Sequence, residues 1–248
     1  MSEAAGEAAA LRLLRTRAFD VLVTNPATTA RKDLSVAHEA RVLQPGLRTV
    51  VLAPALTPED IITALRDEVY ASLSLPVEPH ELQTAIGDAL NEKEWENGID
   101  VLSAVPHWIS LRVACRRVNA ERLTRFMSEL AGDLEESERF NLITAFREIL
   151  LNAMEHGAGF DEEKVVDVSA VRTDRAIVYY FKDPGPGFDP AAPPKAVATP
   201  DDPMSHMLER EEQGVRPGGF GLLLTRKLVD EIHYNEAGNE VILVKHLD

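Results

Sequence analysis

FREILLNAMEHG, residues Phe146–Gly157, is the most informative stretch of this sequence and predicts the last turns of a long helix. Glu148 and Asn152 are four residues apart, so their side chains share one face of that helix about one turn apart. A neutral amide oxygen can ligate Mg²⁺ while the metal keeps waters and takes phosphate oxygens, and a carboxylate one turn away can orient or deprotonate an attacking hydroxyl. A solvated Glu–Asn pair on an amphipathic helix is the alternative interpretation.

A second motif, DPGPGFDP, places Asp183 at the end of a predicted strand, followed by Gly185 and Gly187. Glycine permits positive φ and a close approach of the backbone to a ligand. A buried carboxylate at this position can accept a hydrogen bond from the amino group of an adenine. A plain Pro-Gly turn is the alternative for this motif taken alone.

The third motif, RPGGFGLLLTRKLVDEI, runs a glycine-rich loop into a helix with apolar periodicity. Gly218, Gly219 and Gly221 would leave several N–H groups free at the positive end of that helix, which is an anion site by geometry and dipole. Each motif is weak alone. Together they are specific because of their order in the chain: Glu-x₃-Asn on a helix comes first, Asp-x-Gly-x-Gly after a strand second, and Gly-x-Gly-Leu at the start of a helix third.

These three motifs resemble the N, G1 and G2 boxes of the GHKL family of ATPases, and the resemblance covers about residues 100–248. It implies that the protein binds ATP and Mg²⁺, with Asn152 as the metal ligand, Glu148 as the general base and Asp183 reading the adenine. The other positions that it assigns to the nucleotide site are His156, Gly185, Gly187, Arg216, Gly218, Gly219, Phe220, Gly221 and Leu222.

The segment Asp189–Pro217, rich in Pro, Asp and Met, is interpreted as a lid over the phosphates. Arg210 or Arg216 could reach a γ-phosphate, and a solvated charge on the lid is the alternative for both. For the two histidines His156 and His206, a hydrogen-bonded structural role is favoured over metal ligation.

The compact NAMEHG form, and a strand Trp108–Val113 leading into two helices, look like the branch of anti-sigma-factor serine kinases. That resemblance implies transfer of phosphate to a Ser or Thr of an antagonist-type protein partner, with a sigma factor as a further partner. Two other functions stay open. One is a nucleotide-gated protein-binding module without kinase activity, and the other is a histidine-kinase-like catalytic domain acting in trans.

The first ninety residues alternate strand and helix signals, with apolar runs at Phe19–Thr24 and Leu47–Pro54, and predict a parallel sheet covered by helices. FDVLVTN, LRTVVLAPALTPEDIITAL and SLSLPVEPHEL resemble the second half of a receiver domain of two-component response regulators. Asn25 replaces the acceptor Asp of that family, Ala53 its Thr or Ser switch residue, and Leu75 its Lys. Since an amide cannot form the acyl phosphate of a carboxylate, we expect a degenerate module that is not phosphorylated.

The expected architecture is therefore two domains. An α/β flavodoxin-like, receiver-like domain over residues 1–92 lacks the first strand–helix–strand, and a linker spans 93–103. An α+β two-layer sandwich follows over 104–248. Within it we predict a helix capped by Asn119, the long helix over about Glu136–His156, strands at Val165–Arg172 and Arg175–Lys182, a helix after Gly221 and a last strand at Glu240–His246.

Composition excludes several classes of function. The formal net charge of −15 argues against general binding of nucleic acid, which needs a basic surface. Cys115 is the single cysteine, so neither an intrachain disulfide nor a thiolate metal site can form. The apolar runs are too short for a membrane span and the first residues do not read as a signal peptide, so we expect a cytoplasmic protein. A homodimer that covers the edge of the shortened sheet is left open.

Overall fold

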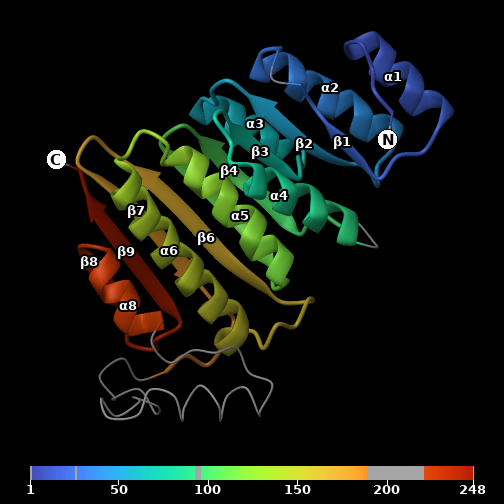
Figure 1. Ribbon diagram of the computed structural model, residues 1–248. Coiled ribbons are helices and arrows are strands. Elements are labelled where there is room, and N and C mark those ends of the chain that lie inside the picture. Colours follow the sequence, from blue (N-terminus) through green and yellow to red (C-terminus); the bar gives the residue numbers. More distant parts are fainter. Residues whose placement is uncertain (1, 26, 93–95, 189–220, 248) are drawn as a thin grey trace.

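The computed structural model describes residues 2–25, 27–92, 96–188 and 221–247, with the backbone alone for 221–224. Figure 1 shows a small amino-terminal α/β region beside a larger sheet that carries helices on one face. None of the described helices is both long and apolar enough to cross a membrane.

The amino-terminal region is the parallel α/β unit that the sequence predicts. Its three strands pair in the order β1-β2-β3, and both pairings are parallel. All six residues of the central strand are buried, as expected for a parallel strand covered on both faces. The elements are α1 Glu7–Thr16, β1 Val21–Val23, α2 Ala30–Leu43, β2 Arg48–Ala53, α3 Pro58–Arg66, β3 Ala71–Ser74 and α4 Pro79–Asn91.

The start of α3 illustrates how local sequence sets these boundaries. Thr57 accepts a hydrogen bond from the Asp60 backbone N–H, and the Asp60 carboxylate accepts one from the Thr57 N–H. This is a reciprocal capping box, and Pro58 occupies the first helical position, where its missing N–H costs nothing. The helix therefore begins at Pro58, directly after Thr57.

The carboxy-terminal region is a two-layer α+β sandwich, which confirms the predicted class. A six-stranded antiparallel sheet has the order β4-β5-β6-β7-β9-β8, and α5 and α6 lie side by side across one face of it (Figure 1). The elements are β4 Ile99–Val105, β5 Trp108–Ala114, α5 Arg117–Leu130, α6 Glu136–Asn152, a π-helical turn η1 Ala153–Gly157, β6 Val165–Arg172, β7 Ala176–Lys182, α8 Gly221–Leu228, β8 Glu231–Tyr234 and β9 Glu240–His246.

Two local predictions are wrong. Residues 99–103, assigned to a linker, belong to β4, an edge strand whose register shifts between Val101 and Ser103; this irregularity hides the alternation that marks a strand. Asn119 does not cap α5, which begins at Arg117. It is fully buried inside that helix, and its amide donates to the carbonyl of Ala114 at 3.1 Å. Asn119 therefore links α5 to the end of β5 by a hydrogen bond.

Arg122 of α5 fastens the two regions to each other. Its side chain is only 1% exposed, and its guanidinium donates to the carbonyl oxygens of Val69 and Tyr70 at 3.2 Å and of Asn97 at 2.6 Å. Burial lowers the pKa of Arg122 to about 9. Buried apolar side chains of α2, β2 and α3 also join the core of the carboxy-terminal sandwich, so the two regions pack as one hydrophobic unit.

Candidate nucleotide-binding site

Helix α6 packs on the sheet through its apolar face, so its polar face points away from the sheet. Phe146 is fully buried, and its ring packs edge-on against Tyr179 of β7, with 4.9 Å between centroids. The same ring lies 5.1 Å from that of Phe181, two residues further along β7. Because β7 leads directly into Asp183, these contacts tie the end of α6 to the start of the DPGPG segment.

The helix does not end in an ordinary α-helical turn. After Asn152 the chain continues as η1, and the Ala158 N–H donates to the Ala153 carbonyl, a π-type hydrogen bond of 3.1 Å. Single π-turns inside or at the end of α-helices occur frequently at functional sites. Here the wider turn brings Gly157 against the segment that follows β7.

Gly157, Asp183 and Gly185 form a close junction that no larger side chain would fit. A Cβ on Gly157 would lie 2.2 Å from Asp183 Oδ1, and a Cβ on Gly185 would lie 2.7 Å from the Gly157 backbone. The Gly185 N–H donates to Asp183 Oδ1 at 2.8 Å. Burial raises the pKa of Asp183, and this hydrogen bond works in the opposite direction. The junction thus places a half-buried carboxylate at the end of α6.

Gly187 is held by the turn between β8 and β9. Its φ is +76°, and a Cβ there would lie 1.9 Å from the Ala237 carbonyl oxygen. Asn235 organises that turn, since its Oδ1 accepts hydrogen bonds from the backbone N–H groups of Gly238, Asn239 and Glu240. The carbonyl of Asn239 in turn accepts from the Asp183 N–H at 3.0 Å. Only glycine therefore suits position 187.

The three helical candidates have different surroundings. Asn152 is half-buried, and its amide makes no hydrogen bond to any residue that the structure describes, so it is available to a ligand. The Glu148 side chain is 14% exposed, and Arg147 Nη1 lies 3.7 Å from its Oε1. His156 is exposed on η1 without a hydrogen bond to the described chain, so the structure gives no support to the structural role predicted for it.

The predicted phosphate-binding loop is described only in part. Gly221 and Leu222 are the first residues of α8, which runs beside α6 (Figure 1). The remaining predicted residues of this loop and of the lid lie outside the described residues. They are His206, Arg210, Arg216, Gly218, Gly219 and Phe220.

Sequence reasoning misses two parts of the site. Gly157 ends the helical motif but receives no role from the sequence, and the turn Asn235–Asn239 is not predicted. The signal for the turn is present, because Asn and Gly closely spaced before an apolar strand are typical of a tight turn. No local signal marks Gly157, since its importance comes from contact with Asp183, which is distant in the sequence.

These residues fit ATP with Mg²⁺. The glycines let the end of η1, the DPGPG segment and the turn before β9 pack closely together. Asp183 offers a half-buried acceptor suited to an amino group, and the unengaged Asn152 amide offers an oxygen of the kind that Mg²⁺ takes. The end of α6, the end of β7 and the turn before β9 thus meet at one end of the α+β sandwich, an arrangement that can hold a nucleotide.

Comparison with known proteins identifies the family. The family model of the histidine kinase-like ATPase domain matches residues 113–245, which is more than half of the chain. The protein belongs to the family of histidine kinase-like ATPase domains. This confirms the predicted ATP-binding domain.

Two other comparisons concern curated proteins and solved structures. No curated protein matches the chain. A solved receiver domain protein (CheY-like) from Methanospirillum hungatei JF-1 is similar at 19% identity with a TM-score of 0.33, covering 36% of this chain and 70% of that one.

Proposed function

We propose that this protein is an ATP-dependent serine/threonine kinase that phosphorylates an antagonist-type partner protein in a partner-switching system. The observation that carries the proposal is the junction of Gly157 with Asp183 and Gly185 at the end of α6, one turn from the unengaged Asn152 amide and two turns from Glu148. The match to the histidine kinase-like ATPase domain supports nucleotide binding, and the compact NAMEHG form supports the serine kinase branch.

Each residue would have a distinct role. Asp183 would accept a hydrogen bond from the adenine amino group. Asn152 would hold Mg²⁺, which neutralises phosphate charge when bound. Glu148 would orient the acceptor hydroxyl and take its proton as the hydroxyl oxygen attacks the γ-phosphorus. The partner would be a small cytoplasmic protein with an exposed Ser or Thr, and a sigma factor would be a second partner of the same domain.

One observation favours a second candidate, a nucleotide-gated binding module without transfer. Arg147 Nη1 lies 3.7 Å from Glu148, and the same guanidinium donates to Glu121 at 3.0 Å through Nε. Glu148 therefore has a cationic neighbour that itself contacts α5. In a binding module, Glu148 would then serve only to keep α6 and α5 in register through Arg147.

Replacing Glu148 with Gln separates the two candidates. For a kinase we expect Glu148→Gln to lower the rate of phosphate transfer by about 100-fold or more, because the general base is lost, while ATP affinity changes by less than threefold. The measurement is transfer of labelled phosphate from ATP to the cognate antagonist, with calorimetry for affinity. Glu155→Gln, about two turns further along in η1, is the matched control. If the wild-type protein bound ATP and the antagonist but transferred no phosphate, the kinase proposal would be wrong and the binding-module proposal would remain.

The same assay tests the histidine-kinase-like alternative. Phosphoserine and phosphothreonine survive acid, whereas phosphohistidine does not. We therefore expect the label on the partner to be acid-stable. An acid-labile product would assign the protein to the histidine-kinase-like group acting in trans.

A further inference from the structure

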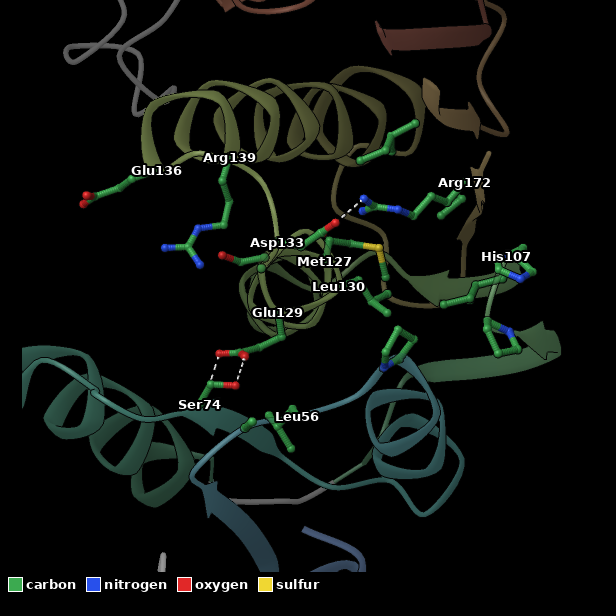
Figure 2. Close-up of a pocket in the computed structure, with 18 of the residues that line it drawn as sticks. Leu56, Ser74, His107, Met127, Glu129, Leu130, Asp133, Glu136, Arg139 and Arg172 are labelled. Atoms are coloured by element: carbon green, nitrogen blue, oxygen red, sulfur yellow. Dashed lines mark hydrogen bonds and ion pairs between the residues drawn. The ribbon is translucent and has the colours of Figure 1, made fainter. Parts of the chain in front are cut away.

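A cavity of about 900 Å³ lies between the two regions, at the opposite end of α6 from Asn152. One wall is made by the carboxyl ends of β2 and β3, where ligands of parallel α/β sheets commonly bind. The other wall is the connection between α5 and α6 with the first turn of α6 (Figure 2). Interfaces between domains are a preferred location for small-molecule sites.

The floor of this cavity is apolar. Met127, Ile109 and Tyr179 are buried beneath it, and Leu56 and Leu130 face it from the two regions, half-buried. Leu56 and Leu130 keep exposed apolar surface, and removing that surface from water is favourable by about 25 cal/mol per Å². The floor therefore suits the apolar body of a ligand.

Two acidic side chains that line the cavity have partners. Glu129 accepts hydrogen bonds from the Ser74 N–H at 3.2 Å and hydroxyl at 2.6 Å, and Asp133 pairs with Arg172 at 2.6 Å. Arg139 of α6 makes no hydrogen bond or ion pair with its side chain to any described residue. Figure 2 shows its guanidinium pointing from α6 into the space between the helices and β3. The cavity thus presents one unengaged cation above an apolar floor.

The charges at the rim limit what this cation can bind. Glu78, Glu81 and Glu136 are exposed at the cavity, and none has an ion-pair partner in the described chain. Like charges repel a ligand with several negative charges more than one with a single charge. A nucleotide or another polyphosphate is therefore disfavoured here, whereas a single carboxylate can pair with Arg139.

We propose that this cavity is a second ligand site, distinct from the nucleotide site, that binds a small organic monoanion with one carboxylate and an apolar body. The carboxylate pairs with Arg139, and the apolar body covers Leu56 and Leu130. The site does not depend on kinase activity, because none of its residues belongs to the nucleotide site.

The probe for the test is 8-anilinonaphthalene-1-sulfonate, a fluorescent monoanion with an apolar body. With the full chain we expect saturable 1:1 binding that octanoate displaces, while 1-octanol and the trianion citrate compete at least tenfold more weakly. Arg139→Gln should weaken the dye at least tenfold, and Arg139→Lys should restore part of the affinity. Arg31→Gln, which removes an exposed arginine on α2, is the control and should change the affinity less than twofold.

Two results would overturn the second site. One is equal dye affinity in wild type and Arg139→Gln, with circular dichroism showing both folded. The other is displacement of the dye by ATP·Mg²⁺, which would place the dye in the nucleotide site. Loss of ATP binding with the Arg139 dependence intact would refute the proposed function and leave the second site standing.

Discussion

Gly157→Ala is expected to weaken ATP·Mg²⁺ binding by at least 100-fold, about 2.7 kcal/mol. The new Cβ would lie 2.2 Å from Asp183 Oδ1, so the carboxylate or the end of η1 must move. Either movement displaces the acceptor intended for adenine. Titration calorimetry measures the effect directly.

The control for this substitution is Gly87→Ala. Gly87 lies in α4, where an added Cβ would meet no atom within 4 Å and no positive φ is needed, so alanine there should leave ATP affinity unchanged. Circular dichroism must show both variants folded. If Gly157→Ala bound ATP as tightly as Gly87→Ala, the junction would not be part of the nucleotide site.

The second large effect concerns stability. Arg122→Met should lower the free energy of unfolding by about 3–5 kcal/mol, because it leaves the carbonyls of Val69, Tyr70 and Asn97 without their buried donor. The methionine keeps the apolar stem and approximate length, so the loss reports the hydrogen bonds rather than a large cavity. Urea denaturation followed by fluorescence and circular dichroism gives the midpoint and slope.

Arg112→Met is the matched control for Arg122→Met. Arg112 pairs with Asp167 at 3.2 Å on the exposed face of the sheet, and an exposed pair contributes only about 0–1 kcal/mol. Equal shifts in the two variants would show that Arg122 does not fasten the regions together. Separate transitions for the two regions in wild type would contradict the shared core.

The architecture could be predicted from the sequence because its signals are local. The apolar strands around Val50 and Phe181 lie where their hydrophobic pattern places them. The edge strand β4 could not be placed, since the register shift after Val101 breaks its alternation. Helix α1 and the short strand β8 are also absent from the sequence prediction.

The residues of the site and of the core beside it also differ in how far the sequence predicts them. Glu148, Asn152 and Asp183 follow from ordered motifs, and the structure brings the end of α6 and the DPGPG segment together. The sequence predicts Asn119 as a helix cap and marks nothing at Arg122, yet both side chains are fully buried inside α5. Burial of a polar group depends on which distant carbonyls the fold brings to it, and one sequence does not contain that information.

The central claim is that ATP with Mg²⁺ binds at the end of α6 through Asn152. The most direct measurement is calorimetric titration of wild type and Asn152→Ala with ATP, in the presence and absence of Mg²⁺. We expect wild type to bind ATP more tightly with Mg²⁺, and Asn152→Ala to lose that gain while remaining folded. Absence of binding in wild type, or the same Mg²⁺ dependence in both proteins, would contradict the account.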